Sequence, residues 1–245
     1  IKSKPYSIIL IAGKGHETTQ TYGKKIINIS DKEIVNNINQ KKLKFDRKNY
    51  NKIFNEEIIK KIVKKNQLRF EGVSINSKRI KKGNLFIAIK GKNYDGHIFV
   101  NEALKNKANY CVVQKNIKNL DKKKLIKCSS TINFLNKLAT LKRSNINSKV
   151  IAITGSSGKT TLKNLLGKTL SEYGKTYFSQ KSYNNQIGVP LSLSNIENDH
   201  KYGVFEIGMS RAGEVLSLSK LVKPNIAIIT NIGEAHIENF DNLNG

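Results

Sequence analysis

Residues 150–170, VIAITGSSGKTTLKNLLGKTL, decide how the second half of this sequence folds. The first four of them are apolar and four of the first five are β-branched, which is typical of a buried strand. A glycine-rich turn, GSSGKTT, follows the strand and opens a helix. Apolar side chains recur along that helix at helical spacing, at Leu162, Leu165, Leu166, Leu170 and Tyr173. The order of strand, glycine turn and helix predicts a phosphate-binding loop.

The turn has the residue types that such a loop needs. Backbone N–H groups at a glycine turn, together with the positive end of the helix dipole, can bind a polyphosphate. Lys159 would neutralise the β- and γ-phosphates, and the hydroxyl of Thr160 would reach Mg²⁺. The motif is a shortened one, because Ile153 stands where the full motif has its first glycine. The flanking strand and helix nevertheless predict nucleotide binding.

Strands and helices continue to alternate after this unit, which predicts a parallel sheet covered on both faces. Strands are expected at 175–178, 202–209 and 225–232, a loop at 179–190 and a helix at 213–222. Glu206 and His236 come near the ends of two of these strands, where ligand sites of such sheets form. Beside Thr160 they could complete a divalent-metal site. Alternatively, they are a strand-end surface acid and a loop histidine.

The first half of the chain is organised differently. A small α/β unit is expected from residue 73 onward, so the fold class is α/β, with this small domain preceding a P-loop domain built on a parallel sheet. Asn55 is expected to cap a helix over 54–65. The other expected elements are a strand at 7–12, a helix at 30–40, a linker at 41–52, a helix at 98–107, a strand at 110–114, a charged surface connection at 116–130 and a helix at 131–144.

The net charge of +26 does not predict nucleic-acid binding. The chain has 39 Lys but only 5 Arg, which is typical of AT-rich coding, whereas nucleic-acid readers favour the bidentate Arg fork. Residues 1–149 nevertheless carry 35 basic and 10 acidic side chains, so this half could attract an anionic substrate. No apolar run approaches the roughly 18 residues of a membrane span, and the start is a poor signal peptide. A cytoplasmic protein is therefore expected.

Four motifs, TGSSGKTT, YNNQIGVPLSL, FEIGMSRAGEV and ITNIGEAHIENF, resemble in this order the central ATPase domain of the Mur ligases. Upstream, SINSKRIKKGNLFIAIKGKNYDGHIFVNEAL is similar to the amino-terminal, UDP-sugar-binding domain of the MurF type within that family. The resemblance implies a UDP-substrate domain at 53–148 and an incomplete ATP-binding domain at 149–245. It also implies that further ligase domains, with a carbamylated lysine and the amine-substrate site, lie outside this chain.

The resemblance further implies roles at the matching positions. Lys159 and His236 would be catalytic, and Thr160, Glu206 and His236 would surround Mg²⁺. Ser77, Asn184 and Asn185 would bind the UDP substrate, although the Asp-Ser-Arg of the family is Asn76-Ser77-Lys78 here. ATP would be bound by Gly155, Ser156, Ser157, Gly158, Lys159, Thr160, Thr161 and Asn231.

The reaction implied is that of an ATP-dependent ligase of peptidoglycan precursor synthesis. The γ-phosphate of ATP would pass to the terminal carboxylate of UDP-MurNAc-tripeptide, and the amine of D-alanyl-D-alanine would attack the acyl phosphate. Two alternatives remain open at this stage: a P-loop kinase that acts on another acceptor, and a nucleotide-binding module without catalysis. The sequence does not define the third residue of the peptide.

Residues 1–40 resemble a different member of the family. ILIAGKGHETTQ and INISDKEIVNNI are similar to the carboxyl-terminal end of the MurE type, in which Gly13 and Glu17 would border the amino-acid site. We therefore expect a piece of a fused two-enzyme ligase that does not turn over by itself.

Overall fold

The structure, a computed structural model, describes residues 19–22, 25–28, 47–63, 67–91, 93–179 and 181–232. The chain divides into two units, Ile1–Asp46 and Arg47–Gly245. The described part of the first unit is an antiparallel hairpin of β1 (Thr19–Tyr22) and β2 (Lys25–Asn28). The strand expected at 7–12 and the helix expected at 30–40 lie outside the described residues.

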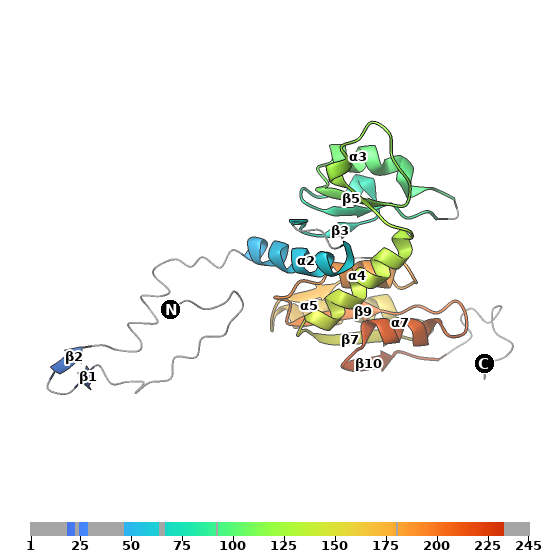
Figure 1. The fold of residues 1–245 in the computed structure, drawn as a ribbon. Helices are drawn as coiled ribbons and strands as arrows, with labels where there is room; N and C mark the ends of the chain where they lie inside the picture. Colours follow the sequence, from blue (N-terminus) through green and yellow to red (C-terminus); the bar gives the residue numbers. More distant parts are fainter. Residues whose placement is uncertain are drawn as a thin grey trace. The chain divides into compact units, whose positions relative to one another are not determined.

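The stretch 150–170 folds as its pattern predicts. β7 (Lys149–Thr154) leads through the glycine turn into α5 (Lys159–Ser171), and the neighbours of β7 are β10 (Ile226–Ile229) and β9 (Tyr202–Glu206). β8 (Thr176–Phe178) pairs with the far side of β9, and all three pairings are parallel. This confirms the predicted parallel sheet (Figure 1).

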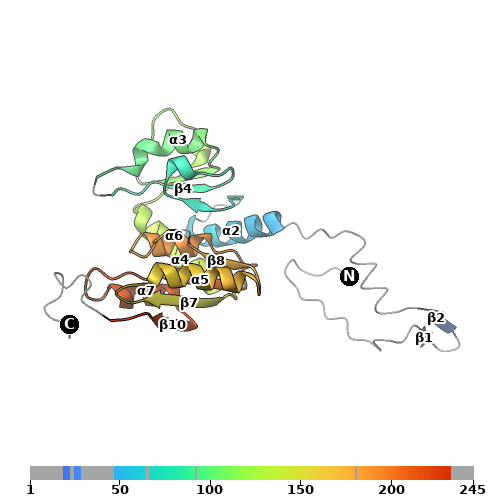
Figure 2. The same cartoon turned by 180° about the vertical axis from the view of Figure 1, so that it is seen from behind.

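Helices cover both faces of this sheet (Figures 1 and 2). On one face, leucines of α5 pack against Ile151 and Ile153 of β7. Val150 and Ala152 alternate with them and join the larger core on the other face, as expected for a strand that is buried on both sides. This second face is covered by α4 (Thr131–Asn145), α6 (Gly188–Asn195) and α7 (Glu214–Val222).

Helix α5 buries a narrower face than its leucine pattern predicted. Leu165 is exposed, and so is Tyr173, which lies beyond the last residue of α5. The buried stripe contains Lys163 and Gly167 instead. A Cβ atom at Gly167 would overlap the ring of Phe178, so the glycine allows β8 to approach the helix closely.

A second, smaller parallel sheet precedes this one in the chain. Its strands follow the order β3 (Val73–Ser74), β4 (Leu85–Ile87), β5 (Tyr110–Val113) and β6 (Leu125–Lys127), with α3 (Val100–Lys105) and three short 3₁₀ turns between them. The stretch 116–130 was expected to be a surface connection, but it contains β6. Only Ile126 of this strand is fully buried, so its lysine-rich surroundings hid the strand pattern.

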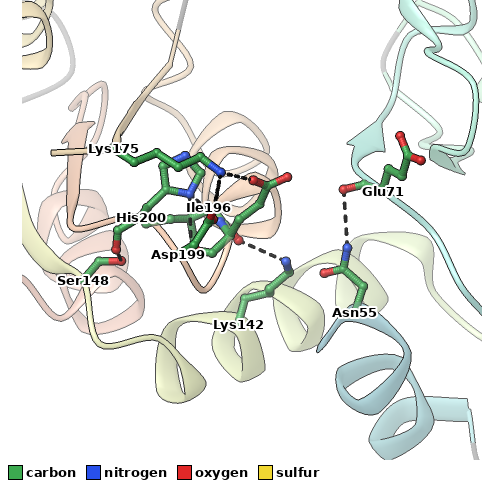
Figure 3. Close-up of polar contacts among 9 residues, drawn as sticks. Asn55, Glu71, Lys142, Ser148, Lys175, Ile196, Asp199 and His200 are labelled. Atoms are coloured by element: carbon green, nitrogen blue, oxygen red, sulfur yellow. Dashed lines mark hydrogen bonds and ion pairs between the residues drawn. The ribbon is translucent and has the colours of Figure 1, made fainter. Parts of the chain in front are cut away.

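Two helices also depart from the expected boundaries. α2 (Arg47–Val63) takes up residues 47–52 of the predicted linker, and Asn55, the expected cap, is buried inside this helix. The Asn55 side-chain amide donates to the carbonyl of Phe70 at 2.9 Å and also to that of Glu71, the bond drawn in Figure 3. Helix α6 begins inside the stretch expected as a loop; because nearly all of its residues are buried, it has no polar face to reveal a helical period. Among the described residues, no helix is long and apolar enough to cross a lipid bilayer.

Lys142 of α4 is a buried cation where α2, α4 and the end of α6 meet. Its Nζ donates to the carbonyl of Ile196 at 3.0 Å and lies 4.9 Å from the centre of the Phe54 ring. Burial lowers the pKa of Lys142 from 10.5 to about 7, against a smaller upward effect of Glu197. Figure 3 shows the nearby cluster in which Lys175 pairs with Glu197 at 2.6 Å and with Asp199 at 2.7 Å.

We expect the Lys142→Met variant to be more stable than the native chain at pH 6. The folded-state pKa of Lys142 lies below the unfolded value, so the unfolded chain binds more protons between about pH 7 and 10.5. Native stability therefore rises with pH across this window, and methionine removes that rise. Replacing a buried ion pair by apolar side chains of similar volume is often neutral or stabilising by about 1–4 kcal/mol, and methionine likewise removes the cost of burying the ammonium. Urea unfolding at pH 6 and pH 9 measures the effect.

The exposed Lys137 on the same helix provides the matched control, because Lys137→Met changes net charge equally without altering burial. Equal pH dependence in the Lys142→Met and Lys137→Met variants would contradict the assignment.

Candidate functional site

Two glycines shape the loop between β7 and α5. Gly155 has φ of +128° and Gly158 has φ of +78°, both in the region that residues with side chains rarely adopt. Gly158 is also the N-cap of α5, so the loop leads directly to the first turn of the helix. The N–H groups of a first turn have no acceptor within their helix and carry its positive dipole end. The loop therefore has the geometry of an anion site.

Thr230 and Asn231, which follow β10, fix the first half of the loop. The backbone carbonyl of Asn231 accepts from the N–H of Ser156 at 3.1 Å, and its side-chain oxygen accepts from the N–H of Ser157 at 2.9 Å. The Asn231 amide donates in turn to the Ser157 hydroxyl at 2.9 Å. The hydroxyl of Thr230 donates to the carbonyl of Ser157 at 2.5 Å. The loop is thus fastened to the neighbouring strand of the sheet.

The two side chains expected to serve a nucleotide lie on the inner side of the loop. The Lys159 ammonium donates to the carbonyls of Gly155 and Ser156 at 2.5 and 2.9 Å. The Thr160 hydroxyl donates to Glu206 at 2.8 Å and lies 3.2 Å from the hydroxyl of Ser182. Thr161 follows on the exposed side of the same turn.

Glu206 is a buried carboxylate at the end of β9, with 2% of its surface exposed. Thr160 donates to one of its oxygens, and Asn184 donates to the other at 2.8 Å. The ammonium of Lys163, itself 0% exposed, lies 3.7 Å from the first oxygen. A carboxylate and a hydroxyl at the edge of a phosphate loop form the hard oxygen donor set that Mg²⁺ prefers. The residues present fit a magnesium ion.

The segment 181–184 connects this loop to a cavity. Ser182 and Asn184 reach Thr160 and Glu206, whereas Lys181 and Tyr183 line an open cavity of about 720 Å³. The N–H of Tyr183 donates to the carbonyl of Lys181 at 2.8 Å, so the backbone turns tightly at Ser182, and neighbouring side chains of the segment reach different sites. The rest of the cavity wall comes from two stretches of the chain, one around β3 and one from β8 to β9. They contribute Glu71, Asn76, Arg79, Lys81, Tyr177, Leu191, Asn195 and Glu197.

Two of the residues predicted to bind substrate, Ser77 and Asn185, have other partners. Ser77 is buried and donates to Glu102 at 2.6 Å, and it does not line the cavity as Asn76 and Arg79 do. The side chain of Asn185 accepts from the N–H of Gly188 at 2.8 Å, at the start of α6. Substrate binding by Ser77, Asn184 and Asn185 stays a prediction. His236, Gly13 and Glu17 lie outside the described residues.

Sequence reasoning missed three contributors to the site: Lys163, Ser182 and Thr230. Lys163 follows Lys159 by one helical turn on the face that α5 buries, so a lysine amid leucines was an available signal. Ser182 and Thr230 carry no comparable signal, because single hydroxyl residues are common in loops.

Known families match most of the second unit. Residues 153–245 match the Mur ligase middle domain, and residues 69–143 match the catalytic domain of the Mur ligase family. A UDP-N-acetylmuramoyl-tripeptide–D-alanyl-D-alanine ligase of Rickettsia prowazekii is 40% identical over 73% of this chain and 39% of its own length. The Escherichia coli protein of that name is 32% identical, with the same two coverages. The chain thus spans about 39% of the length of these relatives.

Solved structures agree with the sequence matches. MurF from Acinetobacter baumannii superposes with a TM-score of 0.66 and 31% identity, over 77% of this chain and 43% of that one. MurF ligase from Thermotoga maritima in complex with ADP superposes with a TM-score of 0.61 and 34% identity, over 74% of this chain and 42% of that one.

Proposed function

We propose, from the premise that this chain belongs to the Mur ligase family, that it supplies the ATP site and a substrate cavity of an amide-forming ligase. The ligase adds D-alanyl-D-alanine to UDP-MurNAc-tripeptide at the expense of ATP. Similar proteins carry this name, and one similar structure contains ADP. The activity belongs to the complete gene product that contains the chain.

The observation that carries the proposal is the position of the segment 181–184. Its alternate side chains reach the phosphate loop on one side and the cavity on the other. An acyl-phosphate ligase needs this juxtaposition, since the carboxylate of one substrate must attack the terminal phosphate of the other. The cationic side chains of Arg79, Lys81 and Lys181 in the cavity lining suit a substrate that bears a diphosphate and carboxylates.

The roles of individual residues follow from their positions. Lys159 balances the negative charge on the phosphates while the tripeptide carboxylate attacks the γ-phosphorus and ADP leaves. Thr160 and Glu206 would hold Mg²⁺, which would supply positive charge at the phosphate oxygens. The amine of D-alanyl-D-alanine then attacks the acyl carbon, and inorganic phosphate departs. The side chain of Asn231 bonds to Ser157 and would position the loop around the phosphates.

Product analysis of the complete gene product tests the proposal. With ATP, Mg²⁺, UDP-MurNAc-tripeptide and D-alanyl-D-alanine, we expect the pentapeptide product by mass spectrometry and one phosphate released per amide bond. L-alanyl-L-alanine serves as the control dipeptide and should give at most a trace of product. Phosphorylated acceptor without an amide bond would support a kinase instead. Nucleotide binding without substrate-dependent turnover would support a binding module.

A further inference from the structure

Lys163 is a charged side chain buried in the helix that begins at the phosphate loop. None of its side-chain surface is exposed, although a buried ammonium costs several kcal/mol unless it is well paired. Burial lowers the pKa of Lys163, and the nearby Glu206 carboxylate partly opposes that effect. A leucine at this position would fill the core without such a cost, so the contacts of the ammonium call for an explanation.

Each contact of the Lys163 ammonium is with an element other than its own helix. Its Nζ lies 3.0 Å from the carbonyl of Lys181, 3.4 Å from the hydroxyl of Ser179 and 3.7 Å from the carboxylate of Glu206. An ammonium has three N–H donors, and three acceptors surround this one. One side chain of α5 therefore touches the end of β9 and the start of the segment 181–184.

The partners of Lys163 lie between the two sites described above. Glu206 accepts from Thr160, and the segment that starts at Lys181 provides Tyr183 to the cavity wall. Ser179 reinforces the arrangement, because its hydroxyl donates to the same Lys181 carbonyl at 2.9 Å. Displacement of the ammonium would remove a shared contact from the carboxylate and from the segment, which would then be held only by their separate partners.

We propose that Lys163 is a positioning residue that holds Glu206 and the segment 181–184 in a fixed relation to the phosphate loop. It keeps the nucleotide site and the cavity aligned and does not touch a reacting atom. This role rests on the proposed function, in which a phosphoryl group passes from ATP at the loop to the substrate in the cavity.

The variant Lys163→Met tests the role, because methionine keeps an unbranched apolar chain and removes all three donors. Lys168→Met, an exposed change on the same helix, is the matched control. Two quantities are measured on the 245-residue chain: amide hydrogen exchange of residues 181–184, and ADP affinity by calorimetry with Mg²⁺ and with a chelator.

In Lys163→Met we expect residues 181–184 to exchange at least tenfold faster. We also expect the gain in ADP affinity on adding Mg²⁺ to fall at least tenfold, while the metal-free affinity stays within twofold. A purely electrostatic role predicts the opposite sign, since removing a positive charge 3.7 Å from Glu206 favours a cation there. If Lys163 only stabilised the fold, Lys163→Met would lower the urea concentration at half-unfolding and leave both measured quantities unchanged. Either of those patterns, or no change, overturns the proposal.

A second variant guards against loss of folding in Lys163→Met. Ser179→Ala keeps the buried ammonium and removes one of its acceptors, so a smaller increase in exchange at 181–184 is expected and its absence counts against the role. Failure of the native chain to bind ADP would refute the proposed function, whereas the exchange measurement would still report on Lys163.

Discussion

Replacement of Lys159 by alanine will lower the affinity of the chain for Mg-ATP by about 100-fold or more. The ammonium of Lys159 lies inside the loop, against the carbonyls of Gly155 and Ser156, where a polyphosphate would meet it. A hydrogen bond to a charged group contributes about 1.5–3 kcal/mol. Two hydrogen bonds from the ammonium to phosphate oxygens of ATP would therefore account for this loss of affinity. Isothermal titration of both proteins with ATP and Mg²⁺ measures the change.

The fold of the Lys159→Ala variant should be unaffected, because the side chain is half-buried at the loop and belongs to no core cluster. Lys168→Ala, on the exposed face of α5, should bind ATP as the native chain does. Equal ATP affinity of the Lys159→Ala variant and the native chain would remove the phosphate-loop assignment.

The sequence predicted the sheet that contains β7 because its strands are short, apolar and separated by clear turns. The sequence predicted helices and strands less well where burial left no periodic pattern of apolar residues. Helix α6 is almost wholly buried and looked like a loop, and β6 has one fully buried side chain among lysines. Leu165 and Tyr173 matched the helical period but are exposed, whereas Gly167 is buried against the ring of Phe178. The spacing of apolar residues in the sequence does not reveal that the backbone at Gly167 lies against the ring of Phe178.

The site was partly predictable for a similar reason. Parallel strands end at the same edge of a sheet, so Glu206 could be placed near Thr160 from strand positions alone, and the structure joins them at 2.8 Å. The partners of Ser77 and Asn185 could not be foreseen, because their hydrogen bonds are with Glu102 and with the first turn of α6. A one-residue motif match does not distinguish a ligand contact from such an internal bond.

The Gly155→Ala variant should bind nucleotide much more weakly than the native chain. A Cβ atom at this position would lie 2.8 Å from the backbone carbonyl of Asn231 and would also collide with the hydroxyl of Thr230. The Asn231 atom belongs to the backbone and the Thr230 side chain is short, so neither can move aside and the loop itself must move. Its movement breaks the bonds from Ser156 and Ser157 to Asn231, which fasten the loop to the sheet.

Backbone strain at Gly155 adds to this collision, and Gly213→Ala separates the two causes. Gly213 has φ of +80° at the N-cap of α7, and nothing lies within 4 Å of an added Cβ atom. Both substitutions share the cost of a side chain at positive φ, about 1–2 kcal/mol, but only Gly155→Ala displaces Thr230 and Asn231. Titration with Mg-ADP should therefore show at least a tenfold loss for Gly155→Ala and less than a twofold change for Gly213→Ala. Native affinity in Gly155→Ala would mean that the loop does not need its bonds to Thr230 and Asn231, which follow β10.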